Sequence, residues 1–200
     1  MFVLTIDQVD SRRTADAVAS VLTELASELG EQLVLPPERT AGDEFQLLIR
    51  EPAAALDTIL RLTRAERWSV GCGIGSVREP LPRDIREASG EAFVSARTAV
   101  DRAKKRATRF ALEASGARDD ATHLEALIDL LLATRSRRSA EGWELHDLLT
   151  AGLTQAAAAT ELGISPQAAS RRAQAADLKI EAGVTAALVT LLAELDGRAS

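Results

Sequence analysis

The order of strand-like and helix-like segments in the first 114 residues restricts the fold more than any other feature of this chain. Short apolar runs that suit strands lie at residues 2–6, 33–35, 45–49, 68–75 and 109–114. Amphipathic spacing that suits helices lies at about residues 14–29, after Pro52, and at about residues 91–106. The order β-α-β-β-α-β-α-β predicts an α+β domain, and its first six elements predict an antiparallel sheet with helices on one face.

One predicted strand, WSVGCGIG at residues 68–75, has an unusual face. Large apolar residues alternate with small ones along it, so one side of the strand is almost without side chains. Such a face lets either a helix or a ligand approach the sheet closely. We favour helix packing, because glycine in a strand has no chemistry of its own.

The polar segment GARDDAT at residues 116–122 is the expected domain boundary. Beyond it every segment favours helix, beginning with a long amphipathic helix from about Ala121 to Arg138. A last helix at about 184–195 has an apolar stripe that suits packing or dimerisation. We therefore expect a ferredoxin-like domain over residues 1–115 and an all-α domain over residues 120–200.

The segment AGDEF at residues 41–45 places acids at the tip of the predicted hairpin. In the expected sheet, Asp43 lies beside Asp7 at the end of the first strand. Two neighbouring carboxylates need a proton or a cation between them, and oxygen ligands suit Mg²⁺. The alternative is structural, because Asp43 and Glu44 also favour a turn and Asp7 also caps a following helix.

AGDEF after a strand that ends in Asp7 resembles the GGDEF signature of diguanylate cyclases and related nucleotide cyclases. SARTAVDRAKKRATRFAL resembles the late helix and strand of the same domains. The resemblance implies a nucleotide-cyclase-type fold, metal ligation by Asp7 and Asp43, an auxiliary acid at Glu44 and a triphosphate contact at Lys104. It therefore implies Mg²⁺ and a nucleotide as ligands. Ala41 stands where the signature has its first glycine, which speaks against catalysis.

The segments IDQVDSRR, GDEFQ and GEAFVSAR, in that order, resemble the SatD family of bacterial proteins over residues 1–114. Members of that family often carry a helix-turn-helix tail. Arg12 and Arg13 in the first segment are candidate phosphate contacts. The alternative is that both are ordinary solvated charges of a helix.

The segment from Leu153 to Leu178 is typical of a helix-turn-helix. Thr154 suits the start of its first helix, Gly163 suits the tight turn, and Ser165-Pro166 suits the start of its second helix. In such motifs the second helix enters the major groove of DNA. The candidate DNA contacts are Ser165, Gln167, Ser170, Arg171, Arg172 and Gln174. The alternative is a helical hairpin that binds a partner protein.

Further DNA contacts are expected outside the second helix. The cluster Arg135, Arg137 and Arg138, together with Lys179, offers candidate contacts to phosphates. The segment DLKIEAG at residues 177–183 is a candidate for a small wing.

Composition limits the remaining choices. The net charge is −6 and neither half of the chain is basic, so binding of nucleic acid requires a local patch. A single cysteine, Cys72, predicts no disulfide and a reducing cytoplasm. The first residues do not suit a secretion signal and no run suits a membrane span.

We expect a homodimeric transcription regulator that binds double-stranded DNA, with a non-catalytic cyclase-like domain as sensor or scaffold. The alternatives are a Mg²⁺-dependent nucleotidyl cyclase or transferase that acts on nucleoside triphosphates, and a protein that serves only assembly.

Overall fold

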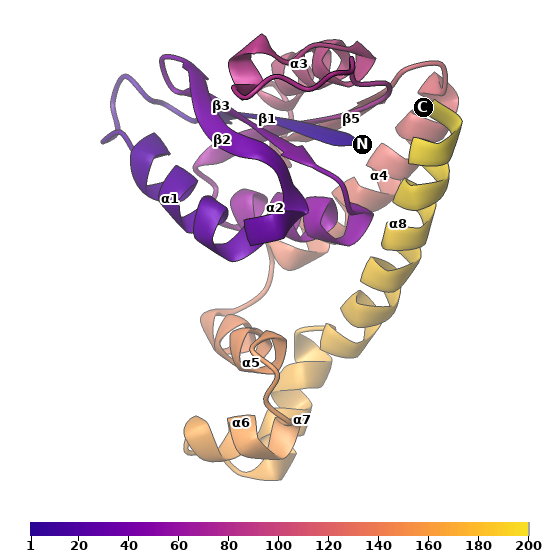
Figure 1. Cartoon of the computed structure of the whole chain (residues 1–200). Coiled ribbons are helices and arrows are strands. Elements are labelled where there is room, and N and C mark those ends of the chain that lie inside the picture. The colour runs from indigo at the N-terminus through magenta and orange to yellow at the C-terminus, as the bar shows by residue number, and fades with distance from the viewer. Residues whose placement is uncertain (200) are drawn as a thin grey trace. The chain divides into compact units, whose positions relative to one another are not determined.

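Figure 1 shows the computed structural model of the chain, which is described for residues 1–199. The chain forms two compact units. Unit 1 contains Met1–Leu132 together with the C-terminal residues from Leu188, and unit 2 contains Ala133–Ala187. The long first helix of the predicted C-terminal domain and the end of the last helix therefore belong with the sheet. The division lies farther along the chain than the expected boundary at residues 116–122.

Unit 1 is built on a five-stranded sheet in the order β2-β3-β1-β4-β5. The strands are β1 Phe2–Gln8, β2 Leu33–Ala41, β3 Glu44–Ile49, β4 Trp68–Ile74 and β5 Phe110–Ala114. The first four pair antiparallel, as their order in the sequence predicts. β5 lies parallel to β4, so the sheet is mixed and the expectation of a purely antiparallel sheet is wrong. The helical crossover between β4 and β5 permits this parallel pairing.

Helices cover both faces of the sheet. The helices of unit 1 and the two short 3-10 turns are α1 Val18–Leu29, η1 Gly30–Gln32, α2 Pro52–Arg64, η2 Ile85–Glu87, α3 Glu91–Ala103 and α4 Arg118–Arg135. α1 and α2 lie on one face and α3 lies on the other (Figure 1). Phe2, Leu4 and Ile6 of β1 point to the first face, where they are completely buried with α1 and α2.

The glycines of β4 are explained by α3. A Cβ atom on Gly71 would lie 2.2 Å from the backbone nitrogen of Val100, and one on Gly73 would lie 2.1 Å from the carbonyl oxygen of Ala92. Side chains at these positions cannot coexist with the helix. The preference for helix packing over a ligand at this face is therefore confirmed.

Two predicted boundaries near the N-terminus are wrong. The second strand continues through Pro36 and Pro37 to Ala41 instead of ending at residue 35, with register shifts along its pairing with β3. Prolines are tolerated there because β2 is an edge strand. The first helix starts at Val18 instead of about residue 14; residues 9–14 form turns and a bend, and residues 15–17 have no regular structure.

α4 is fixed to unit 1 by a buried acid. The side chain of Glu125, 3% exposed, accepts a hydrogen bond of 2.7 Å from the backbone N–H of Leu112. It also accepts two hydrogen bonds from Arg102, of 2.6 and 2.9 Å, and one of 2.7 Å from Arg106. The edge strand β5 therefore gains a partner for one of its backbone donors. α4 begins at Arg118 and ends at Arg135, three residues earlier at each end than expected.

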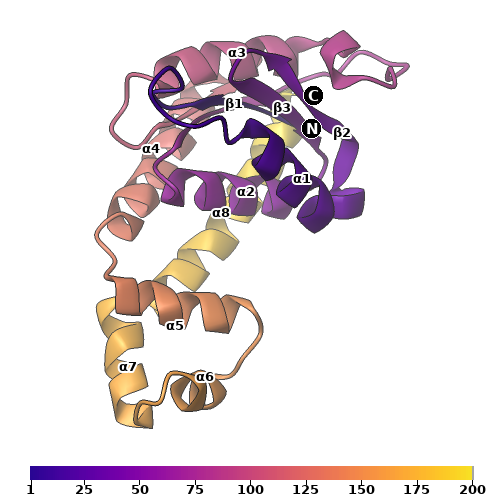
Figure 2. The ribbon, with the colours of Figure 1, turned by 90° about the vertical axis from the view of Figure 1, so that its left-hand side faces the viewer.

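Unit 2 is helical. Its elements are α5 Ala140–Thr150, α6 Gln155–Glu161, α7 Pro166–Ala175 and the first part of α8, which spans Leu178–Ala199. Figure 2 shows α5, α6 and α7 from the side. The segment proposed as a wing is the turn at Asp177 and the start of α8, so that expectation is wrong. Leu188, Leu192 and Leu195 of α8 pack in the core of unit 1, as the apolar stripe of the last helix predicts.

Candidate functional site

The backbone brings the predicted acids of unit 1 to one end of the sheet. Asp7 of β1 is paired with Glu44 of β3, and Asp43 occupies the tight turn between β2 and β3. The backbone N–H of Gln8 donates to the carbonyl oxygen of Asp43 at 3.2 Å. The expected proximity of Asp7 to the hairpin tip is thus observed at the level of the backbone. We call Asp7, Asp43 and Glu44 the acidic hairpin site.

Cations from α3 and its C-terminal cap pair with the acids of this site. The Nζ atom of Lys104 lies 2.7 Å from Oδ2 of Asp7. Arg97 contacts Glu44, whose residue is 6% exposed and which also accepts a hydrogen bond of 3.0 Å from the Oγ1 of Thr40. Arg97 lies on α3, and Lys104 caps the C-terminus of this helix seven residues later with helical backbone angles, so the two residues lie on the same side of the helix. Sequence reasoning named Lys104 but missed Arg97, although the two-turn spacing was visible.

The acids of the acidic hairpin site are paired with cations of unit 1. Among residues 1–199, no three His, Cys, Asp or Glu side chains are grouped so that they hold a metal ion. Lysine and arginine neutralise Asp7 and Glu44 instead. The three predicted metal ligands are therefore close in the fold but are not assembled as ligands around one point.

The loop after β1 is held rigidly beside the hairpin. The buried amide of Gln8 donates to Oγ1 of Thr14 and to the carbonyl oxygen of Ala15, both at 2.8 Å, and accepts from the N–H of Ala17 at 3.0 Å. A buried amide requires such partners. Gln8 was missed in the sequence, although a glutamine at the end of a buried strand is itself a signal.

A second link joins this loop to the hairpin turn. Arg39 of β2 donates to both carboxylate oxygens of Asp16, at 2.7 and 2.6 Å, and to the carbonyl oxygen of Gly42 at 2.9 Å. The hydrogen bond from Arg39, with a second from the N–H of Val18, lowers the pKa of Asp16. Arg39 therefore links the loop after β1 to the turn between β2 and β3, a link that was not predicted from the sequence.

Arg12 and Arg13 are exposed in the loop that Gln8 and Arg39 hold. They lie in turns and not on a helix, so only the helical setting of the alternative is wrong, and both side chains are exposed to solvent as that alternative expects. The candidate cofactor contacts Arg12, Arg13 and Lys104 come from elements that meet at one end of the sheet. Chemically, this end offers guanidinium and ammonium groups on a rigid backbone, which suits a phosphate-bearing ligand.

Unit 2 carries the second candidate site, the two helices α6 and α7 with the turn between them. Oγ1 of Thr154 accepts from the N–H of Ala157, and Oγ of Ser165 accepts from the N–H of Ala168, each at 3.2 Å. Gly163 in the turn has φ of 64°, a conformation that favours glycine. The caps and the turn predicted from the sequence are therefore confirmed.

Small residues allow these helices to pack closely. Ala158 and Ala159 of α6 and Ala169 of α7 are buried, and α5 contacts both helices. A larger residue at any of these positions would separate the helices. The packing leaves the opposite side of α7 available to solvent.

Four of the six predicted DNA contacts share that exposed side, namely Gln167, Ser170, Arg171 and Gln174. The other two have structural partners. Ser165 is exposed but caps α7, and Arg172 is partly buried with its guanidinium 3.4 Å from Glu144. The exposed face of α7 is thus polar and contains one arginine, Arg171.

The arginine cluster before α5 is only partly at the surface. Arg135 and Arg138 have side chains 8% and 2% exposed, and both contact Glu181 of α8. Their guanidinium carbons lie 4.7 and 4.4 Å from the ring centroid of Trp143. The expectation that these two arginines contact phosphates is therefore wrong, because they form a buried joint within unit 2. Arg137 and Lys179 are exposed.

Glu181 is the centre of this joint. Burial raises its pKa, but hydrogen bonds from His146 and Arg138 and the charges of Arg135 and Arg138 outweigh burial and lower the pKa to about 2. The carboxylate is therefore ionised at neutral pH, as two buried guanidinium groups require.

Comparisons with protein-family models, with curated proteins and with solved structures found no match to this chain. Across residues 1–199 no helix combines the length and the apolar character that crossing a membrane requires. The resemblance to the SatD and GGDEF families stays a prediction from short motifs.

Proposed function

We propose that this protein is a DNA-binding transcription regulator. In this proposal α7 is the recognition helix, and unit 1 is a non-catalytic cyclase-like domain, of the ferredoxin-like type expected from its strand order, that senses a phosphate-bearing ligand such as a nucleotide. The observation that carries the proposal is the exposed polar face of α7, presented by a capped helix after a tight glycine turn.

The residue types on this face suit base recognition. Arg171 has the donors to bind the O6 and N7 atoms of guanine, while Gln167 and Gln174 have the paired donor and acceptor that suit adenine. Each such pair contributes about 1–3 kcal/mol of discrimination against a wrong base. The contact of Arg172 with Glu144 supports a structural role for Arg172 on the side of α7 that packs against α5.

Electrostatics favour two copies on one DNA site. Unit 2 has equal numbers of acidic and basic residues, and two of its arginines are buried with Glu181. The exposed cations are few, namely Arg137, Arg171 and Lys179. Non-specific attraction to phosphates is therefore weak for a single copy. A homodimer on a two-fold symmetric site doubles both the phosphate contacts and the base contacts.

Gel mobility shifts with fragments of genomic DNA test this function. We expect a retarded complex whose affinity falls about tenfold or more in Arg171→Ala. Arg83→Ala is the matched control, since Arg83 is an exposed arginine in a loop of unit 1. Equal binding by both variants, or no complex with any fragment, would rule out α7 as the recognition helix.

The non-catalytic assignment of unit 1 has its own test. Lysine and arginine beside two of the three predicted metal ligands support a binding role over turnover. Incubation of the full chain with each nucleoside triphosphate and Mg²⁺ is expected to give no new product. A product that disappears in Asp43→Ala would establish a nucleotidyl cyclase or transferase instead.

A further inference from the structure

α4 has apolar side chains on two different sides. On one side, Leu124 and Ile128 are buried in the core of unit 1. On the other side, Leu127 and Leu130 are 47% and 66% exposed. Burial of such side chains against a partner removes apolar surface from water, which is favourable. The second side of α4 therefore offers apolar surface that the core of unit 1 does not use.

The exposed residues on this second side are three or four positions apart, a spacing that places them along one face of a helix. Together they form what we call the α4 stripe: Asp119, His123, Leu127, Leu130, Thr134 and Arg137. Asp119 lies in the first turn of α4. Arg137 lies two residues after the helix, where its N–H donates to the carbonyl oxygen of Thr134 at 3.2 Å. The stripe is thus acidic at its start, apolar at its centre and basic at its end.

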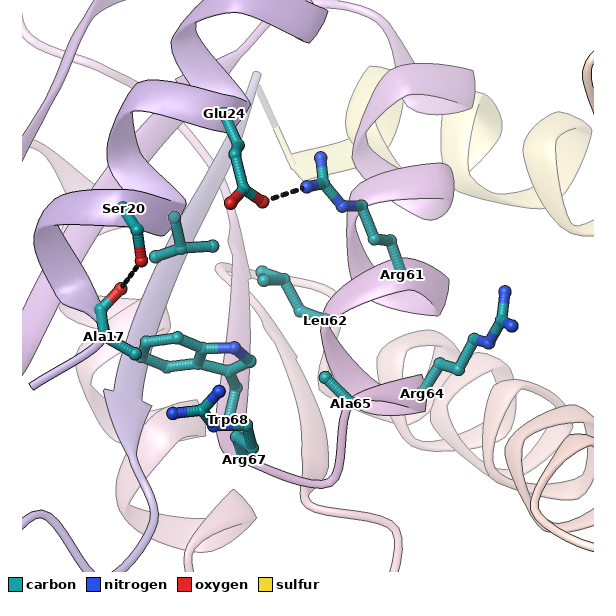
Figure 3. Close-up of a pocket in the computed structure, with 10 residues that line it drawn as sticks. Ala17, Ser20, Glu24, Arg61, Leu62, Arg64, Ala65, Arg67 and Trp68 are labelled. Atoms are coloured by element: carbon teal, nitrogen blue, oxygen red, sulfur yellow. Dashed lines mark hydrogen bonds and ion pairs between the residues drawn. The ribbon is translucent and has the colours of Figure 1, made fainter. Parts of the chain in front are cut away.

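The charges at the two ends of the α4 stripe are not paired within the chain. Within residues 1–199, the structure gives no ion pair to Asp119 or to Arg137. The helices α1 and α2 differ in this respect, because Arg61 of α2 donates to Glu24 of α1 at 2.8 Å (Figure 3). Opposite charges at the two ends of one stripe therefore remain available to a partner.

The α4 stripe is complementary to a reversed copy of itself. In a two-fold symmetric contact, if residue i of one copy meets residue j of the other, then j also meets i. We consider two antiparallel copies of α4 in which Leu127 of each lies against Leu130 of the other. In this register Asp119 of one copy and Arg137 of the other are one residue, or about 1.5 Å, apart along the helix axis. Apolar side chains then meet at the centre and opposite charges meet at both ends.

Charge disfavours a parallel pair of the same helices. In a parallel pair, Asp119 meets Asp119 of the second copy, and Arg137 meets Arg137. Like charges in contact cost free energy, whereas opposite charges fix the orientation of two partners. The α4 stripe therefore fits a second, antiparallel copy of this chain better than a partner whose charge has one sign.

We propose that the α4 stripe is the interface of an antiparallel homodimer. This inference rests on the proposed function for the role of the dimer, because a two-fold symmetric DNA site requires two copies. The stripe is short, so the interface belongs to the small and weak class, and a DNA site with two half-sites strengthens it by holding both copies. In the dimer Arg137 pairs with the second copy, which leaves Arg171 and Lys179 for DNA.

Sedimentation equilibrium of the full chain, without DNA, tests the apolar centre of this interface. We expect a reversible monomer–dimer equilibrium at concentrations from about 1 µM to about 500 µM. Leu130→Glu places an acid from each copy at the centre and is expected to raise the dissociation constant about tenfold or more. Val94→Glu is the matched control, because Val94 is 69% exposed on α3, and it is expected to leave the equilibrium unchanged.

Charge reversal tests the antiparallel register. Arg137→Glu sets an acid against Asp119 of the second copy and is expected to raise the dissociation constant about fivefold, since the dimer contains two such pairs. Adding Asp119→Arg to the same chain restores opposite charges at both ends, so the dissociation constant should return to within about twofold of its original value. Arg83→Glu, at another exposed arginine, is expected to have no effect.

Three results would overturn this proposal: a monomer at every concentration, an unchanged equilibrium in Leu130→Glu, or no recovery when Asp119→Arg is added to Arg137→Glu. The gel shifts described above measure DNA binding separately. A protein that stays monomeric and still binds DNA through Arg171 would therefore contradict the dimer interface and leave the proposed function in place.

Discussion

Two regions differ in whether their charged side chains are paired: the acidic hairpin site of unit 1 and the exposed face of α7 in unit 2. At the hairpin, Asp7 and Glu44 are paired with Lys104 and Arg97 of the same unit. The two arginines of α7 differ: Arg172 contacts Glu144 of α5, whereas Arg171 is exposed to solvent. Paired charges hold a fold together, whereas exposed donors on a rigid helix are ready for a partner.

This comparison also distinguishes arginines that sequence alone treats alike. Arg135 and Arg138 are close in sequence to the exposed Arg137, yet only the first two enter the joint with Glu181 and Trp143. Their role is to hold α4, α5 and α8 together at the base of the helix-turn-helix. The predictions below test this division between structural and available charges.

The largest expected effect is on the buried joint. Glu181→Ala leaves two buried guanidinium groups without their carboxylate, and breaking such a pair costs about 3–5 kcal/mol. Urea unfolding measures this loss when it is followed by tryptophan fluorescence in a Trp68→Phe background, where Trp143 is the remaining tryptophan. Glu144→Ala is the control, because the exposed pair with Arg172 contributes about 1 kcal/mol or less. Similar losses in the two variants would contradict the division.

The next effect concerns the glycines of β4. Gly71→Ala places a Cβ atom within 2.2 Å of the backbone of α3, so the helix must move, and overpacking of this kind costs about 3 kcal/mol. Thermal unfolding measures the change. Gly183→Ala in α8 is the matched substitution, because nothing lies within 4 Å of the added atom. It is expected to stabilise its helix by up to about 1 kcal/mol. A tolerated Gly71→Ala would contradict the packing of α3.

A smaller effect is expected from acid. The folded-state pKa of Glu181 is lowered to about 2, so its stabilising contribution is present above its unfolded-state value of about 4.3 and is lost as pH falls through about 2. We therefore expect unit 2 to lose stability as pH falls from about 5 to about 2. Unfolding midpoints across this range measure the loss, and Glu181→Gln should flatten the curve. If the stability of Glu181→Gln falls with pH as steeply as that of the unchanged protein, titrating groups other than Glu181 control the loss of stability in acid.

The smallest expected effect is at the acidic hairpin site. Lys104→Ala removes a partly exposed ion pair with Asp7, which contributes about 1 kcal/mol or less to stability. If unit 1 binds a phosphate-bearing ligand there, the same variant should weaken binding of a nucleoside triphosphate more than it weakens the fold. Calorimetric titration beside urea unfolding compares the two. Unchanged binding would remove Lys104 from the ligand site.

The sequence predicted what depends on local periodicity and capping. The strand order of residues 2–74, the helix over Pro52–Arg64, the caps at Thr154 and Ser165 and the turn at Gly163 all follow from residue types at fixed spacings. The parallel pairing of β5 with β4 could not be predicted from residue types, because it depends on how α3 packs between the two strands. The docking of α4 through Glu125 likewise depends on contacts with distant residues.

The candidate sites show the same limit. The proximity of Asp7 and Asp43 was predicted from the strand order, and Glu44 was named through the resemblance to GGDEF domains. The cations that pair with Asp7 and Glu44 come from α3 and its C-terminal cap, more than fifty residues after Glu44. Gln8 and Arg39 were missed because their roles arise only when the loop at residues 9–17 folds against the hairpin. Arg135 and Arg138 were assigned to the surface because arginines are usually exposed.

The central claim is that the exposed face of α7 reads DNA. Capture of genomic DNA by the full chain, with sequencing of the bound fragments, tests it most directly when repeated with Gln167→Ala and Arg171→Ala. We predict enrichment of a two-fold symmetric sequence whose half-sites are about 10 base pairs apart, and loss of that enrichment in both variants. No enriched sequence, or the same sequence enriched by both variants, would contradict the account.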